Sequence, residues 1–171
     1  MTDFITTFTG KQFHFLNPTL GEIDIRDIAH ALSLKCRFSG HCKTLYTVGE
    51  HSIRVAEILP SYLQLSGLLH DAAEAYIPDI PTPIKEKFGL VEWENIILSK
   101  IEEKYSIGKH PLVKQADLIL RATEVRDLMP NKIGWDKLLE PLPGVIKPME
   151  SKVVEATFVL LFYLYGGELL S

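Results

Sequence analysis

The sequence predicts an all-α fold, a single helical bundle with a short N-terminal hairpin. Some six segments carry apolar residues at the three- and four-residue spacing of amphipathic helices, and short connections join them. The chain has 171 residues, of which 46% are hydrophobic and 23% charged, as is typical of one soluble domain. It contains no internal repeat. We therefore expect one domain over residues 1–171, with the hairpin at about 4–16 and the helical core at about 24–165.

The first predicted elements are a hairpin and a capped helix. Aromatic and polar residues alternate over residues 4–16, on both sides of Thr9-Gly10-Lys11, which favours two short strands joined by a turn. Asp24 precedes apolar residues at helical spacing, and its side chain can cap that helix. In the loop that follows, residues 34–40, Arg37 stands beside Phe38. Taken alone, this pair is consistent with a solvated charge and a core side chain.

A second capped helix is predicted after this loop. Thr47 and Glu50 have the spacing of a capping box, and helix-spaced apolar residues continue from there until Pro60 ends the helix. His51 lies in its first turn. A lone histidine at such a position is more often a partly exposed surface residue than a ligand. It gains weight only beside a second histidine.

The stretch SGLLHDAAEAYIPDIPTPIK, residues 66–85, carries the strongest chemical signal. In a continuous helix, His70, Glu74 and Asp71 lie at roughly 0°, 40° and 100°, and apolar residues take the opposite side. No Lys or Arg interrupts the polar side, which is unusual for a solvated face. One imidazole and two carboxylates on a common face suit a divalent cation. The alternative is an exposed acidic stripe with a chance histidine, because the His-Asp dipeptide alone is common.

Three prolines predict a stiff loop after this helix. Pro78, Pro81 and Pro83 each restrict φ and push the preceding residue toward an extended conformation. Such a loop can hold Asp79 and Lys85 at a fixed distance from the helix, which catalysis needs more than folding does. A proline turn with a solvated Asp79 is the alternative.

The C-terminal half is predicted to contain three helices and an irregular segment at 131–148. The helices are expected over Val91–Tyr105, Leu112–Leu128 and Val153–Tyr165. Asp117 has Lys114 and Arg121 at helical reach, and an Asp117–Arg121 surface pair is the simplest interpretation. The last helix is shorter than the ~20 residues of a membrane span and contains Glu155, so we expect a buried terminal helix.

Charge and cysteine content argue against several classes of protein. The net charge is −4 and the pI is near 5.9, which disfavours a polynucleotide-binding surface but permits a local basic pocket for a small phosphate ligand. Cys36 and Cys42 are too few for a disulfide framework and predict free thiols in a reducing cytosol. The N-terminus lacks the features of a secretory signal. We expect a cytoplasmic protein, in the host cytoplasm if it is phage-encoded, with no membrane partner.

His51, the His70-Asp71 pair and Asp117 occur in the order H…HD…D, and in this the chain resembles the HD-domain metal-dependent phosphohydrolases. The runs HDAAEAYIPDIPTPIK and LVKQAD resemble the small HD-domain nucleotidases that act on deoxynucleoside 5′-monophosphates. They are also similar to the phage enzymes of this superfamily that remove dATP. The run from FTGKQFHFLNP to YTVGEHS resembles the compact phage and bacterial branch. The resemblance extends from about Phe8 to Pro130.

The resemblance implies a metal site. His51, His70, Asp71 and Asp117 look like the ligands of the principal metal. A mixed set of imidazoles and carboxylates suits Mn²⁺, Co²⁺, Fe²⁺ or Zn²⁺ more than a Mg²⁺ site made of oxygen ligands, with Mg²⁺ confined to secondary sites.

The same resemblance implies roles around the metal. Glu74 matches the residue that orients or deprotonates the attacking water, and Asp79 matches the carboxylate at the ester oxygen that leaves. Phosphate-contacting positions are occupied by Arg37, Lys85 and Lys114. Phe38 stands where relatives place an aromatic residue, often Trp, near the sugar or base.

These roles imply metal-dependent hydrolysis of the bond between the α-phosphorus and O5′ of a deoxynucleoside 5′-phosphate. The first expectation is a dATP or dNTP triphosphohydrolase of the phage type, and the alternative is a 5′-deoxynucleotidase that acts on dNMPs. The cations that could accommodate a triphosphate are Lys35, Lys43, Lys85, Lys114 and Arg121.

Two further classes were weighed, a nucleotide sensor without turnover and a nuclease. Loss of a metal ligand or of Glu74 would favour the sensor, and none is lost. The acidic balance argues against the nuclease. The expected partner is a small deoxynucleotide and not a polynucleotide. Relatives of this size commonly form homo-oligomers, so a dimer or hexamer is expected.

Overall fold

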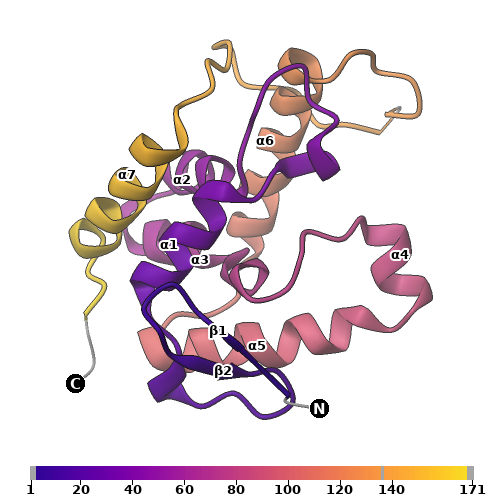
Figure 1. Cartoon of the computed structure of the whole chain (residues 1–171). Coiled ribbons are helices and arrows are strands. Elements are labelled where there is room, and N and C mark those ends of the chain that lie inside the picture. The colour runs from indigo at the N-terminus through magenta and orange to yellow at the C-terminus, as the bar shows by residue number, and fades with distance from the viewer. Residues whose placement is uncertain (1–2, 136, 169–171) are drawn as a thin grey trace.

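The computed structural model describes residues 3–135 and 137–168 and has the expected all-α architecture (Figure 1). The antiparallel strands of the hairpin are β1 (Phe4–Thr6) and β2 (Gln12–His14), in a register that pairs Phe4 with His14. The helices are α1 (Ile25–Leu34), α2 (Val48–Glu57), α3 (Gln64–Leu69), α4 (Thr82–Lys87), α5 (Leu90–Tyr105), α6 (Pro111–Leu128) and α7 (Ser151–Leu164). Short 3₁₀ turns lie at Leu20–Glu22, Arg37–Gly40, Ser61–Leu63 and Ala72–Ala75.

Both predicted N-caps form. The Asp24 carboxylate accepts a hydrogen bond from the Arg26 amide at 3.0 Å, and Thr47 Oγ1 accepts one from the Glu50 amide at 3.1 Å. The Glu50 carboxylate does not complete a capping box, because it accepts from Arg54 and from the Met149 amide instead. α2 therefore begins where the sequence predicts, and the Glu50 side chain ties it to the segment before α7.

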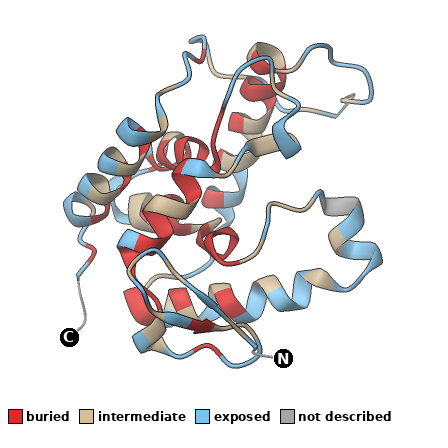
Figure 2. Cartoon of the chain, in the orientation of Figure 1, coloured by how far each residue is buried: buried red, intermediate tan, exposed pale blue. Residues whose placement is uncertain are grey.

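Helices α1, α2 and α3 form the centre of the bundle, with α7 packed along α1 and α6 beside α2 (Figure 1). Figure 2 shows that buried residues gather on these central helices, whereas α4 and much of α5 are exposed. α7 buries one side only: Val154, Phe158 and Phe162 have no exposed surface, while Leu160 and Leu164 are largely exposed. Each fully buried side chain of this kind contributes about 1.5–3 kcal/mol. No helix among the described residues is both long enough and apolar enough to span a membrane.

The contact between α2 and α3 is close because Gly67 faces the backbone of α2. A Cβ atom on Gly67 would lie 2.4 Å from Leu59 Cδ1 and 3.1 Å from Ala56 Cα. No larger residue fits there without displacement. The absent side chain lets the two helices approach, and these are the helices that carry His51 and lead into His70.

The predicted continuous helix through residues 66–76 is wrong. α3 ends at Leu69, Asp71 has φ −105° and ψ 16°, and a 3₁₀ turn takes its place at Ala72–Ala75. The ammonium group of Lys35 donates to the carbonyl oxygens of Glu74, Ala75 (3.0 Å) and Ile77 (2.9 Å). These bonds satisfy carbonyl groups that a longer helix would have used internally. His70, Asp71 and Glu74 therefore do not share one helical face.

Candidate metal centre

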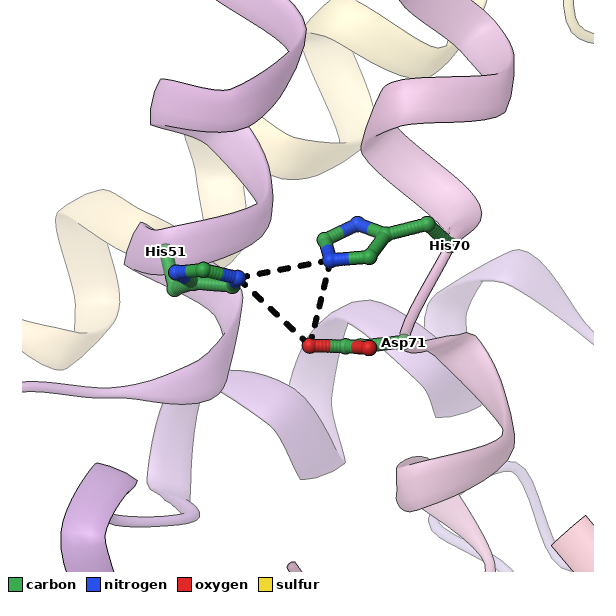
Figure 3. A group of neighbouring side chains, drawn as sticks. All are labelled: His51, His70 and Asp71. Atoms are coloured by element: carbon green, nitrogen blue, oxygen red, sulfur yellow. Dashed lines mark hydrogen bonds and ion pairs between the residues drawn. The ribbon is translucent and has the colours of Figure 1, made fainter. Parts of the chain in front are cut away.

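Three side chains from α2 and from the end of α3 converge on one point (Figure 3). The Nε2 atoms of His51 and His70 are 3.3 Å apart. Asp71 Oδ2 lies 3.2 Å from Nε2 of His70 and 3.6 Å from Nε2 of His51. One ligand atom from each residue lies within 4.8 Å of the others. This spacing allows all three atoms to bind a single ion.

The fourth predicted ligand reaches the same point from α6. Asp117 Oδ1 lies 3.4 Å from His51 Nε2, and its Oδ2 pairs with Lys114 Nζ at 2.7 Å. The simple surface pair of Asp117 with Arg121 is the wrong interpretation, because the carboxylate faces His51 and Lys114 instead. The four residues predicted from the H…HD…D order thus lie together.

Hydrogen bonds fix which nitrogen of each imidazole faces the cluster. His51 Nδ1 donates to Glu124 Oε1 at 2.6 Å, and His70 Nδ1 donates to the Gly67 carbonyl oxygen at 2.7 Å. In the neutral imidazoles both Nε2 lone pairs then point at each other and at the carboxylates. Four acceptors around one point repel each other unless a cation lies between them, so the donor set fits a divalent metal ion.

The charges around this point favour a cation. Burial lowers the pKa of His51, as does Arg37, but the carboxylates of Glu124 and Asp117 outweigh both and raise that pKa to about 9. Burial raises the pKa of Asp71, yet His70, His51 and Arg37 hold it well below its usual range. The His51 site thus holds a positive charge strongly, which a metal ion can supply in place of a proton.

Glu124 is a central member of the site that the sequence analysis did not single out. Its side chain is fully buried and accepts from His51, and its second oxygen accepts from Arg37 Nη2 at 3.0 Å. Burial raises its pKa, but the charges of Arg37 and His51 lower it to about 2. The available signal was spacing: Glu124 follows Asp117 by seven residues, which is two turns along the same face of a helix.

Glu74 lies in the 3₁₀ turn and is almost fully buried. Its Oε1 is 3.3 Å from Lys85 Nζ, and its Oε2 has no hydrogen-bond partner among the described residues. Burial raises its pKa to about 8, together with the nearby charges of Asp71 and Asp79. A buried carboxyl group with a free oxygen and a pKa near neutrality is suited to proton transfer.

Arg37 is neither solvated nor simply surface-exposed. Its guanidinium donates to Glu124 and lies 3.6 Å from Asp71 Oδ2, while its buried Nε lacks a hydrogen-bond partner among the described residues. Phe38 is not a core side chain. It is half-buried at φ 51°, lies under the Arg37 guanidinium and makes an edge contact with Trp135, with ring centroids 5.9 Å apart. Arg37 therefore belongs to the cluster, and Phe38 packs against Arg37 and Trp135.

Comparison with known proteins shows similarity to two bacterial proteins. It is 40% identical to the uncharacterized protein YfdR of Escherichia coli K12 over 146 residues, which are 82% of this chain and 81% of YfdR. It is 30% identical to the uncharacterized protein RCAP_rcc00048 of Rhodobacter capsulatus over 141 residues, or 76% of this chain and 70% of that protein. No family model matches. The chain belongs to the family of YfdR.

In this member of the YfdR family, two of the lysines weighed as phosphate contacts are engaged elsewhere. Lys85 bonds to Glu74 and to Glu94, at 2.9 Å from the latter, and Lys35 is held by the carbonyl groups after α3. Lys114 is exposed and reaches Asp117. Asp79 is half-buried in the loop before α4, close enough to raise the pKa of Glu74.

A cavity of about 400 Å³ adjoins the cluster on the side of α5 and α6. His70, Asp71 and Asp117 form one end of it. The rest is lined by the apolar residues Leu69, Leu98, Ile107 and Val113, by Gly108, and by the polar or charged residues Ser66, Glu102, Lys109, His110 and Lys114. Its volume falls in the range of small-molecule sites, so a ligand that contacts the cluster has room beside it.

Proposed function

We propose that this protein is a metal-dependent phosphohydrolase of deoxynucleoside 5′-phosphates. The observation that carries the proposal is the convergence of His51, His70, Asp71 and Asp117, with a buried carboxyl group and a buried guanidinium beside them. Its imidazole and carboxylate donors suit Mn²⁺, Co²⁺, Fe²⁺ or Zn²⁺, with Mg²⁺ at secondary sites. Because deoxynucleotides are the expected substrates, we assign the activity to the cytoplasm.

His51, His70, Asp71 and Asp117 would hold a divalent metal, which would supply water acidic enough to act as a nucleophile near neutral pH and would polarise a phosphoryl oxygen. Glu74 orients that water and accepts its proton through the carboxylate oxygen that lacks another partner. Lys85 holds Glu74 in place through its other oxygen, a positioning role in place of the expected phosphate contact.

The leaving oxygen and the phosphate charge require further groups. Asp79 protonates O5′ as the phosphorus–oxygen bond breaks, which avoids release of an alkoxide. Arg37 and Lys114 neutralise the non-bridging oxygens, the electrostatic work that dominates phosphoryl transfer. Phe38 packs against Arg37, so a nucleotide whose phosphate contacts Arg37 would place its sugar or base near Phe38.

The first substrate choice is a triphosphate, dATP above all, with release of the deoxynucleoside. The 5′-deoxynucleotidase reaction on dNMPs is the second candidate, and a specific observation favours it. Lys35 and Lys43 donate to backbone carbonyl oxygens, and Lys85 and Lys114 pair with carboxylates, so four of the five cations considered for a triphosphate are already engaged by protein oxygens. Both reactions break the same bond, so only a comparison of mono- and triphosphates as substrates distinguishes them.

The test supplies metal-stripped protein with Mn²⁺ or Co²⁺ and offers the mono-, di- and triphosphates of all four deoxynucleosides, with products identified by chromatography. Deoxyadenosine released chiefly from dATP supports the triphosphohydrolase. Release from several monophosphates moves the assignment to the 5′-deoxynucleotidases. If no nucleotide is hydrolysed with either metal, the proposal fails and a nucleotide sensor becomes the better interpretation.

A further inference from the structure

Glu124 joins a metal-ligand candidate to a phosphate-contact candidate. Its Oε1 accepts from His51 Nδ1 at 2.6 Å, and its Oε2 accepts from Arg37 Nη2 at 3.0 Å. Arg37 extends to Asp71, with 3.6 Å between Nη1 and Oδ2, and the same Oδ2 lies 3.6 Å from His51 Nε2. The four side chains therefore form a closed ring that contains two of the four converging ligands.

Burial makes the two bonds of Glu124 strong and their loss costly. Glu124 and His51 have no exposed side-chain surface, and the Arg37 side chain is 11% exposed. Charge-assisted hydrogen bonds are roughly twice as strong as neutral ones, and an unpaired buried charge pays its full desolvation cost. Because one carboxylate serves both partners, a shift of the His51 imidazole moves the acceptor that holds the Arg37 guanidinium.

We propose that Glu124 is a positioning residue that couples the metal ligand His51 to Arg37, so that a divalent cation and a phosphate group strengthen each other's binding. The phosphate part of this inference rests on the proposed function. The metal part depends only on the His51–Glu124 bond. Groups that hold a ligating histidine by its second nitrogen typically change metal affinity by 10–100-fold when they are replaced.

Glu124→Gln breaks the bond to either His51 or Arg37 with little change in side-chain volume. An amide has one acceptor oxygen, so Gln can accept from either His51 or Arg37 and must turn its NH₂ group toward the other donor. The experiment titrates Mn²⁺ into metal-free protein, with and without inorganic phosphate, and follows free Mn²⁺ by electron paramagnetic resonance. In the parent, phosphate should tighten Mn²⁺ binding. In Glu124→Gln, Mn²⁺ affinity should fall by about 10–100-fold, and most of the phosphate effect should disappear.

Glu50→Gln is the matched control. Glu50 is also fully buried and also holds an arginine, Arg54, but its other oxygen accepts from the Met149 amide and not from a metal ligand. This variant should lose stability and keep the Mn²⁺ affinity and the phosphate effect of the parent. If Glu124→Gln does not fold, Glu124→Asp retains the charge and is too short to hold both partners, so it should show the same two losses.

A second readout follows His51 directly. In the Zn²⁺-loaded parent, the Nδ1 proton of His51 should give a strongly downfield NMR resonance because of its short bond to Glu124, and in Glu124→Gln this resonance should move upfield or exchange with water. If Glu124→Gln keeps the Mn²⁺ affinity and the phosphate effect of the parent, the proposal is overturned. It is also overturned if Glu50→Gln shows the same two losses as Glu124→Gln. If Glu124→Gln loses both Mn²⁺ affinity and the phosphate effect while the parent hydrolyses no nucleotide, the proposed coupling through Glu124 is supported and only the proposed function fails.

Discussion

Two groups of buried or partly buried carboxylates in this molecule differ in how their charges are satisfied. At the start of α1, Asp24 accepts from its own helix and from the Arg26 guanidinium, and Asp27 accepts from the amide and the hydroxyl of Thr9. Around His51, Asp71 and Asp117 each place a carboxylate oxygen within 3.6 Å of the Nε2 atom of that imidazole, and one oxygen of Glu74 has no partner among the described residues. The carboxylates of the first group thus find their hydrogen-bond donors within the protein itself.

The difference separates a structural role from a ligand-binding one. Buried polar groups are normally paired, because an unpaired one costs about 1–3 kcal/mol. The first group meets this rule with donors from nearby residues and anchors the hairpin and α1. The second group meets this rule only in part, because one oxygen of Glu74 has no partner among the described residues. Replacements in the two groups should therefore affect different properties.

Asp71→Asn should have the largest effect, because it removes a charged ligand from the second group. We expect Mn²⁺ to raise the melting temperature of the parent and to have little effect on this variant. The kcat/KM for the best nucleotide should fall by roughly 10³-fold or more, since a bound metal contributes several kcal/mol to the reaction. Melting curves with and without Mn²⁺ and steady-state kinetics measure both.

Asp27→Asn is the control for this change, with the same substitution at a buried aspartate of the first group. It should lower stability by about 1–3 kcal/mol, because its amide cannot accept from both donors of Thr9. Its response to Mn²⁺ should equal that of the parent. An Asp71→Asn protein that still responds fully to Mn²⁺ would remove Asp71 from the ligand set.

Glu74→Gln should keep the metal and lose turnover. A positioned acid or base contributes about 10²–10⁴-fold, so we expect kcat to fall within that range while Mn²⁺ content stays at the parental level. Glu94→Gln is the control, because Glu94 is the other carboxylate partner of Lys85 and leaves Glu74 unchanged. Equal kcat for Glu74→Gln and the parent would exclude Glu74 from proton transfer.

Two of the four candidate ligands, His51 and Asp117, could be placed from the sequence because each lies in a helix whose start is marked by local residues. Thr47 caps α2 and sets the turn that holds His51, and Asp117 lies within α6, which begins at Pro111. The assignment of all four residues as candidate ligands came from their order in the chain and their residue types, which resemble those of HD-domain phosphohydrolases. The overall all-α fold followed from apolar spacing in the same way.

The parts that could not be predicted depend on contacts between distant segments. The break after α3 depends on Lys35, which bonds to carbonyl groups about forty residues later in the chain, and no local pattern marks this. Glu124 resembles any acidic residue on a helix until His51 is placed against it. Lys85 appeared free for phosphate because its carboxylate partners lie on two other elements.

Gly67→Ala tests whether the second group depends on the approach of α2 and α3. The new methyl group would lie 2.4 Å from Leu59 Cδ1 and 3.1 Å from Ala56 Cα, so the Leu59 side chain must move and the backbones of α2 and α3 must shift apart by a few tenths of an ångström. We expect a loss of about 1–3 kcal/mol in the free energy of unfolding, measured by urea titration, and weaker Mn²⁺ binding. Gly108→Ala, where a Cβ meets no atom within 4 Å, should change stability by less than about 0.5 kcal/mol. Equal stability of the two variants would contradict this packing argument.

Asp24→Asn should have the smallest effect and one that depends on pH. Hydrogen bonding to Arg26 outweighs burial and holds the pKa of Asp24 well below its usual range. A carboxyl whose folded pKa lies below its unfolded value, about 3.9, contributes stability above the unfolded pKa and loses it as the pH falls toward the folded pKa. Because Asn retains the cap, the parent should exceed Asp24→Asn by up to about 1 kcal/mol at pH 7. Urea midpoints should show the gap narrowing below about pH 4. Arg26→Gln should reduce the stability difference at pH 7 as well. A difference that does not shrink between pH 4 and pH 2 would show that the charge of Asp24 is not its source.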